Sequence, residues 1–153
     1  MKFPNKIGKI HFIHGDSNAK LKTILDRLND YQRGVIFLDP YAMELEWNIL
    51  KDIQATGVLD VWYLFPFSAV NRNLYNDGKI PQPIKNKLNT VFGDDKWEAA
   101  IYKKTPQMTL FGDRVSEKVD AENIRDYILT KMEEIFPCVS KESIFLKNEN
   151  NSP

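Results

Sequence analysis

Three predicted strand ends in the first half of the chain carry the residue types best suited to binding or chemistry. They read Gly15-Asp16-Ser17, Asp39-Pro40-Tyr41 and Phe65-Pro66-Phe67. Ligands of open parallel sheets bind beyond the carboxyl ends of the strands, so acids and aromatic rings placed there are candidates for ligand contacts. The alternative is that Asp16 and Asp39 cap the helices that follow, because a carboxylate stabilises the positive end of a helix.

Asn71 and Arg72 are further candidates outside these strand ends. They follow Pro66-Phe67, where a helix can begin beyond the third strand. Arg72 could pair with a phosphate or carboxylate of a ligand in the same cleft, or with a nearby acid on the surface of its own helix.

Metal, thiol and phosphate-loop chemistry have little support. His11 and His14 are three residues apart on a predicted strand, so they point to opposite faces and a shared metal is not expected. Cys138 has no histidine near it in the sequence and is expected to be an inert thiol. The seven glycines form neither a GxGxxG nor a GxxxxGK loop.

The first half of the chain alternates strand and helix signals. Apolar strand candidates cover residues 9–13, 35–38 and 61–65. Apolar residues at helical spacing predict a helix from about Asn18 to Asp30, capped by Ser17 or Asn18, and a second helix that ends at Gly57. This alternation predicts βαβ units and an α/β fold with a mostly parallel sheet, in which strand 35–38 is covered on both faces.

The second half of the chain reads as helical. Apolar stripes predict a helix that ends at Gly93, a short one that carries Trp97, and a longer one from Asp120 to the stop at Pro137. Residues 143–146 predict one short strand, and the polar tail 148–153 is expected to fray. No linker or repeat divides the chain, so a single domain over residues 1–147 is predicted.

Composition excludes several classes of protein. The 153 residues are 42% hydrophobic and 27% charged, which is enough to bury a core without disulfides or metal. Twenty-one basic residues balance 21 acidic ones, so no basic patch attracts nucleic acid or anionic lipid. The longest apolar run, 61–65, is too short to span a bilayer, and the N-terminus lacks the apolar core of a signal peptide. The single cysteine fits a reducing compartment, so we expect a cytoplasmic protein without membrane contact.

The strand ends also resemble those of a known family. Leu38-Asp39-Pro40-Tyr41 is similar to the Asp-Pro-Pro-Tyr motif of class I S-adenosylmethionine-dependent methyltransferases that act on exocyclic amino groups, with one proline in place of two. Gly15-Asp16-Ser17-Asn18 resembles the acidic loop that reads the cofactor's adenine in those enzymes. Over most of residues 9–147 the chain resembles the three-Cys-motif partner protein family (TcmP). That wider match follows, in order, residues 34–41, Trp47, Thr56-Gly57, Asp60, Phe65-Pro66, Asn71-Arg72 and 92–97.

The resemblance implies roles for the candidate residues. Asp16, with Ser17 beside it, would accept a hydrogen bond from the adenine amine of S-adenosylmethionine, the implied cofactor. Asp39 and the carbonyl of Pro40 would accept the two N–H bonds of a substrate amino group, whose lone pair then attacks the cofactor's methyl group. Tyr41 would stack on a flipped nucleic-acid base. The residues implied on the substrate side are Phe65, Pro66, Asn71 and Arg72. The implied partner is a three-Cys-motif protein.

The resemblance also implies an incomplete, Rossmann-like three-layer sandwich. Segments 9–13, 35–38 and 61–65 would be its third, fourth and fifth strands, and the two strands that separate the third from the fourth would precede Met1, together with the glycine-rich cofactor loop. We therefore expect a methyltransferase-like domain that is inactive on its own. The alternative is a non-enzymatic binding module that acts through a partner protein.

An open edge on strand 35–38 is the physical consequence of such a gap. An unpaired apolar edge invites self-association or pairing with another chain. Three outcomes stay open: strand 9–13 closes directly on strand 35–38, a second polypeptide fills the gap, or the chain is the remnant of a split gene.

Overall fold

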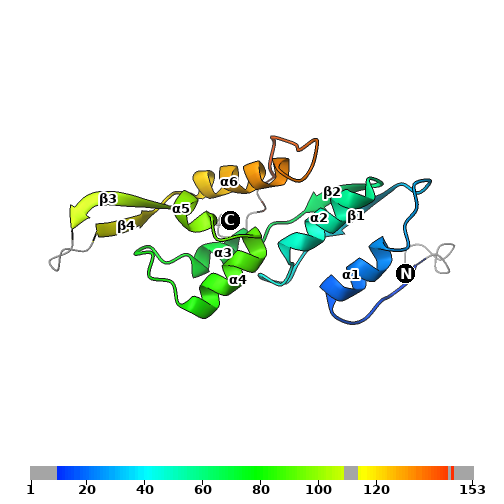
Figure 1. Cartoon of the computed structure of the whole chain (residues 1–153), viewed down its shortest axis with the longest axis horizontal. Coiled ribbons are helices and arrows are strands. Elements are labelled where there is room, and N and C mark those ends of the chain that lie inside the picture. Colours follow the sequence, from blue (N-terminus) through cyan, green and yellow to red (C-terminus); the bar gives the residue numbers. More distant parts are fainter. Residues whose placement is uncertain (1–9, 109–113, 145, 147–153) are drawn as a thin grey trace.

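The structure, a computed structural model, describes residues 10–108, 114–144 and 146. In chain order its elements are α1 (Ser17–Leu25), β1 (Gly34–Leu38), α2 (Trp47–Thr56), β2 (Leu59–Tyr63), α3 (Phe67–Asn73), α4 (Gln82–Phe92), α5 (Trp97–Ile101), β3 (Tyr102–Met108), β4 (Arg114–Lys118) and α6 (Ala121–Glu133). Figure 1 shows an elongated molecule, with α1, α2, β1 and β2 at one end, the other helices in the middle, and β3 and β4 extending from the opposite end.

The predicted α/β pattern is confirmed for β1, α2 and β2. The two strands pair in parallel, in register from Gly34 opposite Leu59 to Leu38 opposite Tyr63. Gly57, with a left-handed φ of 63°, ends α2 as predicted. Strand pairing begins at Leu59, two residues after Gly57. The strand β2 therefore covers Leu59–Tyr63, two residues earlier at each end than the predicted range 61–65.

Helices cover one face of this small sheet. The buried side chains of that face form a cluster with α1 and α2 that contains Leu25, Leu38, Leu45, Trp47, Ile49, Leu50 and Ile53. On the opposite face Val35 is 66% exposed, Phe37 65% and Trp62 58%. The prediction that strand 35–38 is buried on both faces is therefore wrong for the described residues, and a three-layer sandwich is not confirmed.

Two further predicted strands are absent from the described residues. Residues 10–13 have no strand partner in the described part of the chain, and Ile10, Phe12 and Ile13 are exposed. A strand forms only where a neighbour takes its backbone hydrogen bonds, so the apolar residues of this segment are not sufficient. The alternative in which strand 9–13 closes directly on β1 is contradicted for residues 10–13, and Lys9 lies outside the described residues. Residues 143, 144 and 146 also form no strand, and Phe145 lies outside the described residues.

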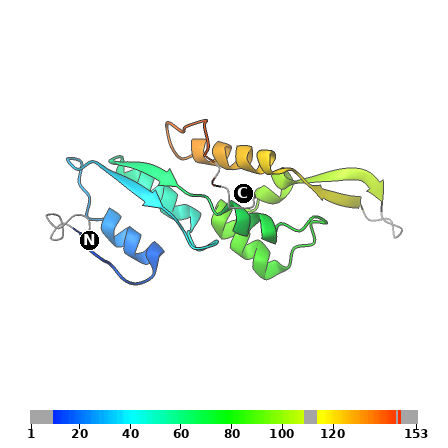
Figure 2. The same ribbon diagram turned by 180° about the vertical axis from the view of Figure 1, so that it is seen from behind.

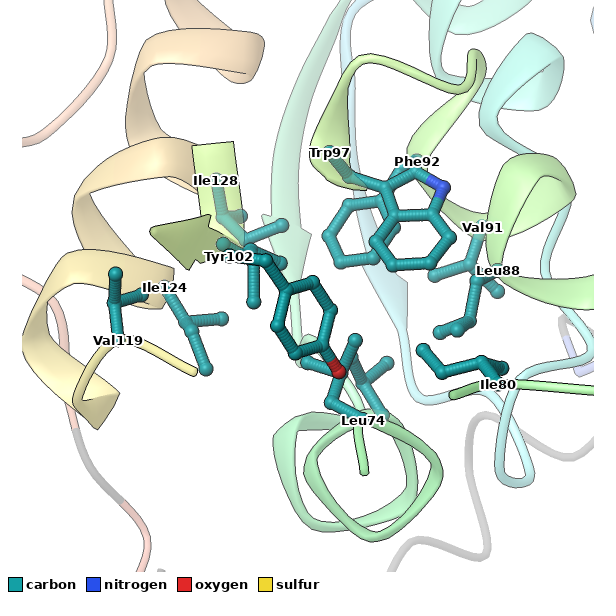
Figure 3. Packing of buried hydrophobic residues seen from close by; sticks show 12 residues of the cluster. Leu74, Ile80, Leu88, Val91, Phe92, Trp97, Tyr102, Val119, Ile124 and Ile128 are labelled. Atoms are coloured by element: carbon teal, nitrogen blue, oxygen red, sulfur yellow. The ribbon is translucent and has the colours of Figure 1, made fainter. Parts of the chain in front are cut away.

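The three predicted helices of the second half form and enclose a core of their own, although α6 ends at Glu133, before the predicted stop at Pro137. Gly93 ends α4, and the Asp120 side chain caps α6 by accepting the Asn123 N–H at 2.9 Å. Figure 3 shows the Phe92 ring stacked on Trp97, with ring centroids 5.8 Å apart. The buried members of this core are Val70, Leu74, Ile80, Leu88, Val91, Phe92, Trp97, Ile101, Tyr102, Val119, Ile124 and Ile128. Among the described helices, none is long and apolar enough to cross a membrane.

The antiparallel pair β3–β4 was not predicted, because the sequence indicated no element between the short helix at Trp97 and the helix that begins at Asp120. Tyr102 pairs with Lys118, and the ladder has an irregularity between Lys104 and Met108. The stretch Lys103-Lys104-Thr105-Pro106-Gln107 lacks the alternation of apolar and polar residues that marks a half-buried strand. The strands are instead fixed at their base, where Tyr102 and Val119 are buried in the core and the Tyr102 hydroxyl donates to the Tyr75 carbonyl at 2.7 Å.

A buried ion pair joins the two cores. Lys131 of α6 is 7% exposed, and its Nζ lies 2.6 Å from Oδ2 of Asp94 and 5.7 Å from the centre of the Trp47 ring. Trp47 begins α2, and Asp94 follows the glycine that ends α4. Three segments far apart in sequence are thus held at one point between the sheet end and the helical middle of the molecule.

Candidate functional site

A groove of about 590 Å³ lies at the carboxyl end of β1. Its walls are the segment from Ile13 into α1, the last residues of β1, and the loop that leads to α2. Asp16, Ser17, Asp39, Pro40 and Tyr41 all line it. The structure thus brings together the residues predicted to bind cofactor and those predicted to be catalytic.

Asp16 is the N-cap of α1, a role that the sequence left as the alternative and that Ser17 and Asn18 do not take. Its Oδ1 accepts the Ala19 N–H at 2.8 Å. Asn18 instead donates from Nδ2 to the Glu44 carbonyl at 2.9 Å and accepts the Glu46 N–H on Oδ1 at 3.2 Å. These two bonds fix the start of α1 to the loop before α2, so they hold the two walls of the groove together. The cap uses one carboxylate oxygen of Asp16, and the other has no hydrogen-bond partner among the residues that the structure describes, so it can serve a ligand.

Asp39 caps no helix. The residue before α2 is Glu46, and eight residues of chain separate β1 from α2. Within the described residues the exposed Asp39 carboxylate has neither a hydrogen bond nor an ion pair. Tyr41 is 88% exposed, so its ring is accessible to a ligand. The groove therefore contains a carboxylate without a partner among the described residues, Asp39, and an accessible aromatic ring, Tyr41, two residues apart in the sequence.

The loop after Tyr41 contains a strained backbone. Ala42 has a φ of 48°, in the left-handed region that residues with a Cβ rarely adopt. Such strain persists only where the surroundings impose it, and here the Glu44 N–H donates to the Tyr41 carbonyl at 3.2 Å across the turn.

Replacing Ala42 by glycine should stabilise the protein. Glycine removes the steric cost of the left-handed conformation, which is about 1 kcal/mol. Part of this gain is offset because glycine raises the conformational entropy of the unfolded chain. The midpoint of urea unfolding should rise by the equivalent of a few tenths to 1 kcal/mol. A lower midpoint would mean that the turn is not strained.

Phe65 and Pro66, predicted to line the substrate side, lie away from this groove. The Phe65 ring packs edge-on to Tyr63 with centroids 5.9 Å apart and lies 6.1 Å from the ring centre of Phe92. Pro66 precedes α3 as its N-cap residue. The position of Phe65 at the end of β2 directs its ring into the helical core rather than toward the end of β1.

Asn71 and Arg72 have structural partners on α3 and β4. Lys118 donates from Nζ to Asn71 Oδ1 and to the Leu74 carbonyl, both at 3.0 Å, which satisfies the end of α3. Burial lowers the pKa of Lys118 below its ordinary value. Arg72 donates from Nε to the Ser68 carbonyl at 3.3 Å on its own helix. Neither residue lines the groove.

Lys20 and Glu44 line the groove and were not singled out from the sequence. Lys20 is four residues after Asp16, and a helix places residues at that spacing on one side, so this signal was available. Glu44 carries no such signal because it lies in a loop, and its Oε1 is 3.1 Å from Lys87 Nζ. No group of three or more His, Cys, Asp or Glu side chains among the described residues could hold a metal ion.

The residues present fit one end of S-adenosylmethionine. The free oxygen of Asp16 can accept the adenine amine, and the apolar side chains of Ile13 and Leu38 line the same groove. For the methionine end the chain offers no glycine-rich loop anywhere in its sequence.

Comparison with protein-family models, with curated proteins and with solved structures finds no match for this chain.

Proposed function

We propose that the groove is the adenosine-binding corner of a methyltransferase-like, Rossmann-like α/β fold of the three-Cys-motif partner type. The observation that supports this most is the convergence of Asp16 with Asp39-Pro40-Tyr41 on one groove. S-adenosylmethionine, when bound, supplies the methyl group. Asp16 accepts the adenine amine, and Asp39 with the Pro40 carbonyl holds the N–H groups of a substrate amine.

The chain by itself is proposed not to transfer methyl groups. Binding of the methionine end needs backbone N–H groups from a glycine-rich loop, and the sequence has none. The adenosine end alone gives weak binding. It follows that adenosine and S-adenosylmethionine bind the isolated chain with about the same affinity.

Calorimetric titration of the chain with each ligand tests this proposal. We expect affinities within about threefold of each other, in the millimolar range, which corresponds to about 4 kcal/mol of binding free energy. If S-adenosylmethionine binds at least tenfold more tightly than adenosine, or if the chain alone transfers methyl groups, then the chain does have a site for the methionine end and the proposal is wrong. Absence of adenosine binding would contradict the adenosine corner itself.

Asp16→Ser separates the ligand role of Asp16 from its capping role. Serine is as good an N-cap as aspartate, so α1 should stay intact while the free carboxylate oxygen is lost. Adenosine affinity should fall by about tenfold or more, since a hydrogen bond to a charged acceptor contributes about 1.5–3 kcal/mol. Asp30→Ser, at an exposed aspartate outside the groove, is the matched control and should leave affinity unchanged.

Asp39→Ala should leave the fold intact. The side chain is exposed and has no partner among the described residues, so the free energy of unfolding should change by less than about 0.5 kcal/mol. Urea unfolding followed by tryptophan fluorescence measures this. A loss above 1 kcal/mol would mean that Asp39 is structural and unavailable for a substrate.

A non-enzymatic binding module that acts through a partner protein is the second candidate. The exposed apolar side chains of Val35, Phe37 and Trp62 on the open face of the sheet favour it. A three-Cys-motif protein is the proposed partner. Nucleic acid is a weaker candidate as a direct ligand, because the acids Asp16, Asp39 and Glu44 line the groove together with Lys20.

A further inference from the structure

Among the described residues, the backbone groups on the outer edge of β1 have no strand partner. Gly34 donates its N–H to the Val58 carbonyl at 3.1 Å, and the Leu38 carbonyl accepts the Leu64 N–H at 2.9 Å, so even-numbered residues of β1 face β2. Backbone groups alternate sides along a strand, so Val35 and Phe37 direct their N–H and C=O groups to the outer edge. Within the described part of the chain β1 pairs with β2 alone.

The groove extends along this same edge. Ile36 and Phe37 of β1 lie on one side, and Leu21 and Ile24 of α1 lie on the other. Ile24 is 39% exposed although it points into the groove, so an apolar floor stands uncovered beside the free edge. Figure 2 shows α1 displaced from the sheet on the β1 side rather than under β2. An unpaired edge above an apolar floor is the geometry in which an added strand is bound.

We propose that an extended strand of a partner protein binds in this groove by adding to the outer edge of β1. Its backbone pairs with Val35 and Phe37, and its alternate side chains cover Leu21 and Ile24. The end of the strand that lies beside Asp39 carries a basic residue, because Asp16, Asp39 and Glu44 outnumber Lys20 among the charged residues that line the groove. The Asp39 carboxylate also has no partner among the described residues.

A second copy of this chain fits the groove less well than a single strand. Helices α1 and α2 cover the same face of the sheet and share one buried cluster. Symmetric antiparallel pairing of two β1 edges keeps the helices of both copies on one face of the joined sheet, where the two α1 helices, each displaced to the β1 side, would meet. A lone strand brings no helix with it. The inference goes beyond the proposed function and does not depend on it, because a free edge binds a strand whether or not the groove binds adenosine.

A library of random displayed seven-residue peptides, selected on the wild-type chain, tests the proposal. We expect enriched peptides with alternating apolar residues and a lysine or arginine near one end. A labelled enriched peptide should bind at least tenfold more weakly to Phe37→Pro, which removes an outward N–H that has no strand partner in the described part of the chain. Trp62→Thr is the matched control, because it changes the open face on β2 and leaves the edge of β1 intact. Its affinity for the peptide should stay within twofold of the wild-type value.

A charge exchange keeps the test decisive if Phe37→Pro fails to fold. Asp39→Lys should lower the affinity for the enriched peptide at least tenfold. Replacing the basic residue of the peptide by glutamate should restore binding to the Asp39→Lys variant and not to the wild type. Failure to enrich any peptide, or equal binding to wild type and Phe37→Pro in its folded form, would overturn the proposal. So would concentration-dependent dimerisation that protects the Val35 and Phe37 amides from hydrogen exchange, because the occupant would then be a second copy.

Discussion

Replacing Gly93 by alanine should destabilise the protein by roughly 3 kcal/mol or more. Gly93 has a φ of 83°, which disfavours any residue with a Cβ. A methyl group there would also overlap the Trp47 ring, with Cγ 2.6 Å away. Trp47 is 2% exposed and packed at the start of α2, so it cannot turn aside without disturbing the core. Urea unfolding followed by tryptophan fluorescence measures the loss.

Gly57→Ala is the matched control for this prediction. Gly57 also has a left-handed φ, of 63°, at the end of a helix, but a Cβ there would meet no atom within 4 Å. Gly57→Ala should therefore lower the free energy of unfolding by only about 1 kcal/mol, the steric cost of a left-handed backbone in a residue with a Cβ. If both substitutions cost the same, the close approach of Gly93 to Trp47 is not what holds α2 against the end of α4.

Replacing Lys131 by alanine should cost about 3 kcal/mol of unfolding free energy. The Lys131 side chain is 8% exposed, and its ammonium group lies 2.6 Å from Asp94 and 3.5 Å from Glu134. The substitution leaves the Asp94 carboxylate, itself only 26% exposed, without its closest cation and removes the alkyl chain from the packing around Trp47. Lys131→Met keeps the alkyl packing and should recover part of the loss.

The pair at Lys85 and Glu98 is the control for burial. It has the same 2.6 Å separation, but its side chains are 26% and 44% exposed. Lys85→Met should therefore cost less than about 1 kcal/mol. Equal losses at the two pairs would contradict a special role for the buried one.

The Lys131–Asp94 pair also predicts a dependence on pH. Partial burial raises the pKa of the Asp94 carboxyl, but hydrogen bonds from Lys131 and from the Lys96 N–H, with the charges of both lysines, outweigh it and hold the pKa below its ordinary value of 3.8. The stabilisation is complete above that ordinary value and is lost as the pH falls through the lowered value of the folded state. The difference in stability between wild type and Asp94→Asn should accordingly shrink below about pH 4.

The parallel unit of the fold could be predicted because its signals are local. The continuous apolar run of β1 and the glycine that ends α2 each determine their own segment. The strand prediction for residues 10–13 failed because a strand depends on a neighbour, which no local pattern reveals. The strands β3 and β4 were not predicted because they pair with each other although their sequences lack alternating apolar residues.

The candidate site could be predicted in the part that rests on topology. Carboxyl ends of strands and the loops beside them lie together, so Asp16 and Asp39 meet at one groove. The direction of the chain after β2 could not be read in the same way. Phe65 turns into the helical core, and Asn71 binds Lys118 from a strand that the sequence did not predict.

Titration of the isotope-labelled chain with adenosine, followed by ¹H–¹⁵N spectra, tests whether the groove at the end of β1 binds the adenosine end of a cofactor. We expect chemical-shift changes confined to the amides of Ser17, Asp39 and Tyr41 and their neighbours in the groove, with the same set shifted by S-adenosylmethionine. Shifts centred on Asn71 and Arg72, or no shift at saturating adenosine, would contradict it.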